Sequence, residues 1–139
     1  MSVDDADRRI LEVLKEDARI PFVELAKKVG LSEATVRRRV RSLVSRGIIK
    51  KFTIELGLKE GAKAMTLLSV SPSKPTPEVA EALKKLKGVE AVYEITGQYD
   101  VVAIISGSNI AEINKYVDEI RKVDGVEHTN TIIIMRVVT

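Results

Sequence analysis

A chain of 139 residues is long enough for one domain of average size or two small ones. It has no cysteine and a single histidine, which excludes disulfides, thiolate chemistry and a histidine pair for a metal or a catalytic relay. We therefore expect no catalytic residue, no metal and no cofactor, and we predict that the chain is not an enzyme. The acidic start is unlike a signal peptide and no apolar run is long enough to span a bilayer, so we expect a cytoplasmic protein without a membrane partner.

The net charge of +3 is unevenly distributed along the chain. Residues 1–51 carry a net charge of +5, whereas residues 52–139 carry a net charge of −2. From Glu33 to Lys51 there are seven basic residues and one acidic residue. This asymmetry favours an N-terminal part that faces nucleic acid, joined to a part with another role.

Three helices are predicted in residues 1–50. Asp4 is a candidate N-cap for the first helix, and Gly30 ends the second. The third helix is expected from its N-cap Ser32 to about Arg46, with Gly47 closing it. Its apolar face consists of Val36, Val40, Leu43 and Val44. A short helix, a turn with glycine and a second helix in this pattern indicate a helix-turn-helix domain.

The opposite face of the third helix carries small polar residues and arginines, which suits a helix that enters the major groove of DNA. Thr35, Arg38 and Arg41 are expected nearest to the bases. The remaining predicted DNA contacts are Ser32, Arg37, Arg39, Ser42, Arg46, Lys50 and Lys51. A basic face that is only solvated is the alternative.

Residues 48–56 are β-branched and partly alternating, which predicts a short strand. We assign residues 51–62 to this linker strand and a hinge, because glycines at 57 and 61 flank a short polar segment. The predicted domains are therefore 1–50, a linker over 51–62, and 63–139.

Residues 63–139 contain two similar copies at an offset of 37 residues. Gly88-Val89-Glu90 matches Gly125-Val126-Glu127, and each copy is predicted to form a strand, a helix and a strand. Asn109 and Glu112 resemble a capping box at the start of the second helix. Two copies predict a ferredoxin-like β-α-β-β-α-β domain, which makes the whole chain α+β. One sheet face is then uncovered and apolar, which favours a homodimer.

Tyr99 and Asp100 belong to a turn at residues 96–100, where the two copies join. Asp100 could bond local backbone amides, as in an ordinary hairpin turn. It could instead hold the ammonium group of a small zwitterionic ligand, whose carboxylate the turn's amides would bind. The turn therefore predicts either a structural role or a ligand-binding role for Asp100.

The segments Phe22-Val23-Glu24-Leu25-Ala26-Lys27-Lys28-Val29-Gly30-Leu31-Ser32 and Val92-Tyr93-Glu94-Ile95-Thr96-Gly97-Gln98-Tyr99-Asp100 resemble the two halves of the Lrp/AsnC (feast/famine) family of transcription regulators. The resemblance covers essentially the whole chain. It implies a helix-turn-helix domain followed by a RAM/ACT-like sensing domain, in a prokaryotic, nucleoid-associated protein. It also implies a homodimer, often assembled to an octamer, that binds double-stranded promoter DNA.

The same resemblance implies an amino-acid effector bound between subunits. The residues that match the family's effector site are Gly97, Gln98, Tyr99, Asp100, Thr129, Asn130 and Thr131. Two alternatives remain, a chromatin-like protein that coats DNA generally and a stand-alone amino-acid sensor that regulates a metabolic partner. RNA binding on the sheet is disfavoured, because the strands lack stacking aromatics.

Overall fold

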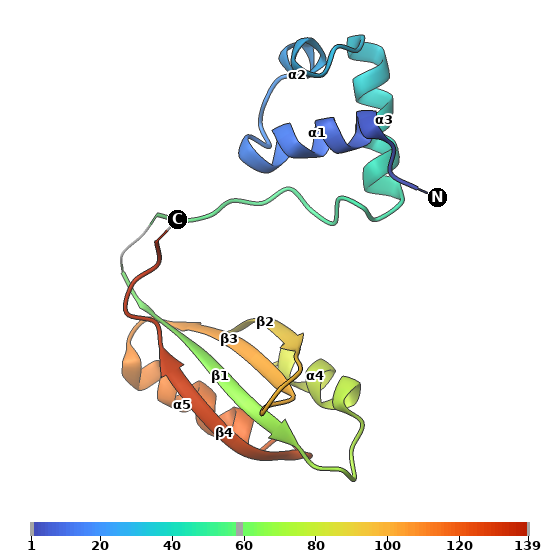
Figure 1. Cartoon of the computed structure of the whole chain (residues 1–139). Coiled ribbons are helices and arrows are strands. Elements are labelled where there is room, and N and C mark those ends of the chain that lie inside the picture. The colour runs from blue at the N-terminus through green and yellow to red at the C-terminus, as the bar shows by residue number, and fades with distance from the viewer. Residues whose placement is uncertain (1, 58–59, 139) are drawn as a thin grey trace. The chain divides into compact units, whose positions relative to one another are not determined.

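The computed structural model describes residues 2–57 and 60–138, which form two compact units (Figure 1). Residue contacts assign 1–57 to the first unit and 58–139 to the second. The division falls inside the stretch 51–62 that the sequence assigns to the linker. Each unit has a buried core of its own, so each is a separate packing unit.

The first unit consists of three helices, as the sequence predicts. They are α1 (Asp5–Glu16), α2 (Phe22–Val29) and α3 (Glu33–Ser45). The Asp4 carboxylate accepts the amide of Asp7, and the Ser32 hydroxyl accepts the amide of Thr35. Gly30 ends α2 with a φ of 71°, in the left-handed region that favours glycine. Local polar groups and one glycine therefore set these helix ends.

One apolar face from each helix forms the core of the first unit. Ile10 of α1, Leu25 of α2 and Leu43 of α3 are fully buried. Val44, which the sequence places on the apolar face of α3 with Val36, Val40 and Leu43, is not buried with them, because its side chain is 45% exposed. At 3.6 residues per turn, Val44 lies roughly 70° around the helix from the centre of the buried face. It therefore sits at the edge of that face rather than in it.

The strand predicted over residues 48–56 is absent. A strand needs a hydrogen-bonding partner, and the described part of this chain pairs none with the segment. Its alternating apolar side chains, Phe52, Ile54 and Leu56, are instead exposed by 53%, 74% and 69%. The alternating pattern that predicted a strand therefore reflects an exposed apolar segment, which no other described segment of the chain pairs with.

The second unit is a four-stranded antiparallel sheet with the strand order β2-β3-β1-β4. In chain order its elements are β1 (Ala62–Val70), α4 (Thr76–Lys84), β2 (Val89–Glu94), β3 (Val101–Gly107), α5 (Ile110–Arg121) and β4 (Val126–Ile133). This is the ferredoxin-like plan, and the predicted α+β fold class is confirmed.

The two copies of the repeat have the same geometry at their helix-to-strand turns. Gly88 precedes β2 with a φ of 87°, and Gly125 precedes β4 with a φ of 98°. A side chain is strained at such angles, which accounts for glycine in both copies. Of the predicted capping box at α5, one bond is present, since the Asn109 side chain accepts the amide of Glu112 at 2.9 Å, whereas the Glu112 carboxylate accepts the amide of Ser108 rather than that of Asn109.

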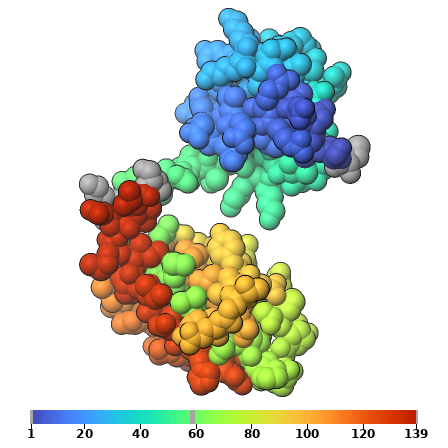
Figure 2. All heavy atoms as spheres, viewed as in Figure 1, coloured from blue at the N-terminus to red at the C-terminus, as the bar shows by residue number. Residues whose placement is uncertain are grey.

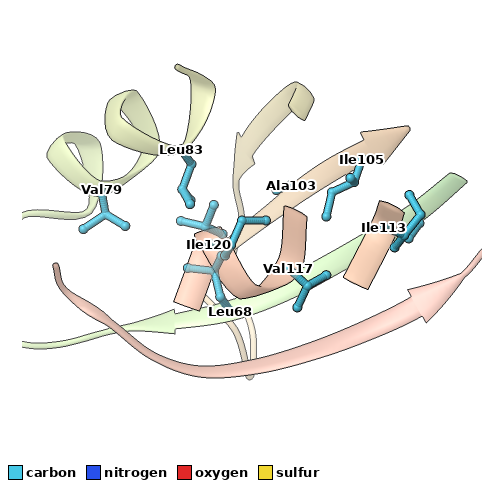
Figure 3. Close-up of a cluster of buried hydrophobic side chains, with 10 residues drawn as sticks. Leu68, Val79, Leu83, Ala103, Ile105, Ile113, Val117 and Ile120 are labelled. Carbon is cyan, nitrogen blue, oxygen red and sulfur yellow. The ribbon is translucent and has the colours of Figure 1, made fainter. Parts of the chain in front are cut away.

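Both helices pack on one face of the sheet and bury an aliphatic core (Figure 3). The side chains that point toward one another in that view come from β1, β3, α4 and α5: Leu68, Val79, Leu83, Ala103, Ile105, Ile113, Val117 and Ile120. Alternation along each strand then sends the intervening residues to the opposite face.

Among the described residues of the second unit, no helix covers the opposite face of the sheet, as the sequence predicts. The strands expose their side chains there, over β1, β3 and β4 in Figure 2. The residues that alternate with the core residues are Met65, Leu67, Val102, Ile104 and Ile132. Ile132 is 48% exposed, although Val102 at the centre is buried among its neighbours. The uncovered face is therefore apolar along its middle.

A pair of glycine substitutions tests the packing of the repeat. A Cβ at Gly125 would lie 2.8 Å from the Cγ2 atom of buried Val79, whereas a Cβ at Gly97 meets nothing within 4 Å. Both glycines have positive φ, so the substitutions share backbone strain but not the steric clash. We expect Gly125→Ala to lower the free energy of unfolding by about 2–4 kcal/mol and Gly97→Ala by about 1–2 kcal/mol, measured by denaturant titration. Equal losses in the two variants would contradict the clash at Val79.

Candidate functional site

The outward face of α3 is the first candidate site. Ala34, Arg38 and Arg41 are exposed on it, and Ser42 is half-buried beside them. Among the described residues, the guanidinium groups of Arg38 and Arg41 form no hydrogen bond or ion pair, so their donors are available to a ligand. Planar arginine groups on a helix with small neighbours suit the acceptor-rich edges of base pairs.

Arg37, at the side of this face, is held by two neighbours. Its Nη2 atom lies 2.6 Å from the Glu33 carboxylate, one turn earlier in α3. Its guanidinium also lies over the Phe22 ring of α2, 4.7 Å from the ring centroid. A carboxylate and an aromatic face both stabilise a guanidinium, so the direction of Arg37 is constrained.

Arg39 and Arg46, two further predicted DNA contacts, have partners inside the protein. The Nη1 atom of Arg39 lies 2.7 Å from the Asp4 carboxylate and 3.1 Å from that of Asp7, and Nη2 of Arg46 lies 3.4 Å from Asp7. Asp7 is only 5% exposed. These two arginines therefore fasten α3 to the start of α1 rather than extend away from the unit.

Arg39 also lowers the pKa of Asp4, the N-cap residue of α1. Its hydrogen bond to Asp4 is the largest cause that lowers the pKa of that carboxyl below its ordinary value of 3.8. The Asp4 carboxylate therefore stabilises the folded unit at pH values above 3.8, and this stabilisation is lost as the pH falls through the lowered folded value. The network is intact at neutral pH.

The other predicted DNA contacts are at the two ends of α3. Ser32 and Thr35 bond each other at the helix start, with 2.8 Å between their hydroxyl oxygens. Lys50 and Lys51 follow the helix and are exposed. Two positive charges beyond the C-terminus of α3 suit phosphate contacts more than base contacts.

The turn at residues 96–100 is the second candidate site. Asp100 Oδ2 accepts the amide of Val70 at 2.8 Å, and the Asp100 backbone bonds Leu68 and Ile95. The carboxylate thus has a structural role at the end of β1. Gly97 and Gln98 are exposed, and Tyr99 is half-buried.

The three polar residues predicted from β4 do not share one face of the sheet. Thr131 bonds Thr66 within the helix-covered layer at 3.0 Å, and Thr129 accepts the Arg121 Nε–H at 3.2 Å. Asn130 alternates with them and lies on the uncovered face, opposite Leu67. One ligand on that face can reach Asn130 but not both threonines.

Two residues that shape the α3 site are absent from the set predicted from the sequence. Asp7 lies in the first turn of α1, where an acidic residue interacts favourably with the helix dipole. Its carboxylate also forms ion pairs with Arg39 of α3 and with Arg46, the C-cap of α3. Glu33 does give a visible signal, because it is a single acid in a basic stretch. The partners of Asp7 give none, because the arginines it meets are 32 and 39 residues away.

Comparisons with known proteins agree with this two-part structure. A family model described as winged helix-turn-helix DNA-binding matches residues 3–50, and the model of the Lrp/AsnC ligand binding domain matches residues 63–139. The chain is 45% identical to the HTH-type transcriptional regulator LysM of Saccharolobus solfataricus, over 97% of this chain and 95% of that protein. The chain belongs to the Lrp/AsnC family. It is thus a transcription regulator with a DNA-binding domain followed by a ligand-binding domain.

Solved structures of the Lrp/AsnC family have the same fold. E. coli AsnC matches with a TM-score of 0.78 and 27% identity, over 98% of this chain and 94% of that chain. The M. tuberculosis feast or famine regulatory protein complexed with L-methionine matches with a TM-score of 0.83 and 26% identity, over 99% of this chain and 95% of that chain. Within the described part of the present chain, no helix is long and apolar enough to cross a bilayer.

Removing the Asp7 charge tests the internal network. Asp7→Asn leaves Arg39 and Arg46 facing a neutral amide, so we expect the free energy of unfolding of the first unit to fall by about 1–3 kcal/mol. The matched control is Asp5→Asn, whose exposed carboxylate pairs only with exposed Arg8 and should change stability by less than about 0.5 kcal/mol. Amide hydrogen exchange of α3 in the full chain measures the stability change in each variant. Equal protection in the two variants would contradict the anchoring role.

Proposed function

We propose that the chain regulates transcription by binding promoter DNA as a homodimer, with α3 in the major groove, under the control of an amino acid. The observation that carries the DNA-binding part is the separation of the α3 arginines into two sets. Arg39 and Arg46 are engaged by α1, whereas Arg38 and Arg41 extend from the exposed face with their donors available. Only the second set can form bidentate bonds with guanine without breaking an internal ion pair.

In this proposal the contacts divide into base-reading and phosphate-binding groups. Thr35, Arg38, Arg41 and Ser42 read base edges, while Lys50, Lys51 and the Ser32 end of α3 bind the sugar-phosphate backbone. A two-fold symmetric dimer presents two copies of α3 to half-sites about one helical turn of DNA apart, or a multiple of that distance.

Two apolar surfaces support self-association. The uncovered sheet face carries a row of aliphatic side chains, of which Ile132 is 48% exposed, and the 48–56 segment exposes Phe52, Ile54 and Leu56. Isolated soluble chains seldom leave two such surfaces in water. Sheet-to-sheet packing of two chains buries the first, and pairing of two 48–56 segments buries the second. Further assembly to a tetramer of dimers is part of the proposal.

An amino acid is the proposed effector, bound between subunits at the 96–100 turn and Asn130. A zwitterion needs N–H donors for its carboxylate and an acceptor for its ammonium. Gly97 and Gln98 are exposed residues whose amides would supply the donors, and the Asp100 carboxylate would be the acceptor. The M. tuberculosis relative complexed with L-methionine supports this chemistry. Ligand binding and DNA binding coupled by about 1–3 kcal/mol would be typical of such a regulator.

Two single variants test how α3 binds DNA. The probe is a duplex that the full chain selects from a random library, compared with a scrambled duplex of the same composition. We expect Arg38→Ala to weaken binding to the selected duplex by about 1–3 kcal/mol and the scrambled duplex by much less. Lys50→Ala should weaken both duplexes and reduce the slope of log K against log salt by about one unit.

The control for these variants is Lys115→Ala, an exposed lysine of α5 that should leave both affinities unchanged. Equal losses on the two duplexes for Arg38→Ala would contradict base reading by Arg38. That result would favour a protein that coats DNA without sequence preference.

The effector site is tested with Asp100→Asn, because asparagine keeps an oxygen for the Val70 amide and removes the charge. The probe is whichever of the twenty amino acids raises the melting temperature of the wild-type chain most. We expect its affinity, measured by calorimetry, to fall at least about tenfold while DNA binding without the amino acid is unchanged. Unchanged amino-acid affinity would refute the assignment of Asp100. The control is Asp118→Asn, which removes an exposed carboxylate of α5.

A further inference from the structure

Glu33 is the one acidic residue between residues 33 and 51, a stretch with seven basic residues. It occupies the first turn of α3 and its side chain is 44% exposed. A carboxylate in the first turn of a helix is stabilised by the helix dipole. On a surface that meets phosphates, however, the same carboxylate is repelled, so its position affects DNA binding as well as the helix.

The contact of Glu33 with Arg37 fixes one of the arginines near this face. Glu33 Oε1 lies 2.6 Å from Arg37 Nη2, and the Phe22 ring lies under the same guanidinium at 4.7 Å. Arg37 is therefore bound on one side by a carboxylate and covered on another by a ring. Unlike Arg38 and Arg41, it has a compensated charge and a restricted direction.

These side chains border a shallow hollow on α3 of about 300 Å³. Its lining consists of four long charged side chains and one small side chain: Glu33, Arg37, Arg38, Arg41 and Ala34. Long side chains around an alanine leave room for the edge of a base pair. An arginine at this border can donate to guanine only if its direction fits that base.

We propose that Glu33 determines sequence selectivity by positioning Arg37. The ion pair with Glu33 and the stacking on Phe22 direct Arg37 toward a base edge and keep it from bonding phosphates on any sequence. On DNA without an acceptor at that position, the pair gains no base contact and the Glu33 carboxylate repels the backbone. This inference rests on the proposed docking of α3 and adds Arg37 to the base-reading group.

The test compares Glu33→Gln with Glu24→Gln in the full chain. Glu24 is the matched control, because it is an exposed first-turn glutamate of the adjacent helix α2 without an ion pair among the described residues. The probes are the selected and the scrambled duplex, each titrated at several salt concentrations. We expect Glu33→Gln to bind the scrambled duplex more tightly, with a salt slope steeper by about one unit, because Arg37 is released to phosphates.

Discrimination between the two duplexes should then fall by on the order of tenfold in Glu33→Gln and stay unchanged in Glu24→Gln. Adding Arg37→Gln to Glu33→Gln should return the scrambled-duplex affinity to the wild-type value. If Glu33→Gln and Glu24→Gln change both affinities by the same factor, Glu33 is an ordinary surface charge and the inference is overturned. If the added Arg37→Gln leaves the scrambled-duplex affinity high, the effect does not pass through Arg37, and the inference is equally overturned.

Failure of α3 docking is recognised separately. In that case Arg38→Ala leaves both duplex affinities at the wild-type value, whereas failure of the Glu33 inference alone leaves the Arg38→Ala effect intact. Melting curves of every variant confirm that the first unit is folded.

Discussion

A buried carboxylate in α1 determines what the arginines of α3 can do. Asp7 is almost completely removed from solvent, and its carboxylate forms ion pairs with Arg39 and Arg46. A carboxylate with so little contact with water is stabilised by its cationic partners, so these two arginines are kept in place. Because 39 and 46 are seven residues apart, nearly two helical turns, fixing both also fixes the rotation of α3 about its axis. Arg38 and Arg41 are then directed away from the unit.

The charge of the first unit therefore has two different uses. Its excess of basic residues is a property of the whole unit and attracts DNA at long range. In the proposed mechanism, selectivity depends instead on which guanidinium groups are held, by which partner, and in which direction. Three kinds of environment occur on one helix: internal ion pairs for Arg39 and Arg46, a surface pair with stacking for Arg37, and free groups for Arg38 and Arg41 among the described residues. Neighbouring arginines of one sequence run thus differ in their contacts.

Much of the fold follows from local sequence signals. Helical periodicity, the caps Asp4, Ser32 and Asn109, and the glycine at 30 predict helix ends that the structure confirms. The offset of 37 residues predicts the second unit, because an internal repeat carries its topology with it. The prediction of a strand over residues 48–56 is wrong, because strand formation depends on a partner strand that the local sequence does not specify.

The candidate sites are less predictable than the fold. The exposed direction of Arg38 follows from the helical wheel, but the engagement of Arg39 depends on where Asp4 and Asp7 lie after folding. The sequence spacing between Arg39 and these two aspartates does not reveal the ion pairs. The opposite orientation of Asn130 and its two threonine neighbours, by contrast, follows from strand alternation alone. The direction of these β4 side chains is therefore predictable from the sequence, whereas the contacts of the arginines depend on how distant segments pack.

The most direct test of this account is a measurement of each arginine in the full chain when DNA binds. Arginine Nε–H resonances of isotope-labelled protein can be assigned by single Arg→Lys substitutions and followed during titration with the selected duplex. We expect the signals of Arg38 and Arg41 to shift and become protected from exchange with water, while those of Arg39 and Arg46 do not shift. Shifts confined to Arg39 and Arg46, with Arg38 and Arg41 unchanged, would contradict this account.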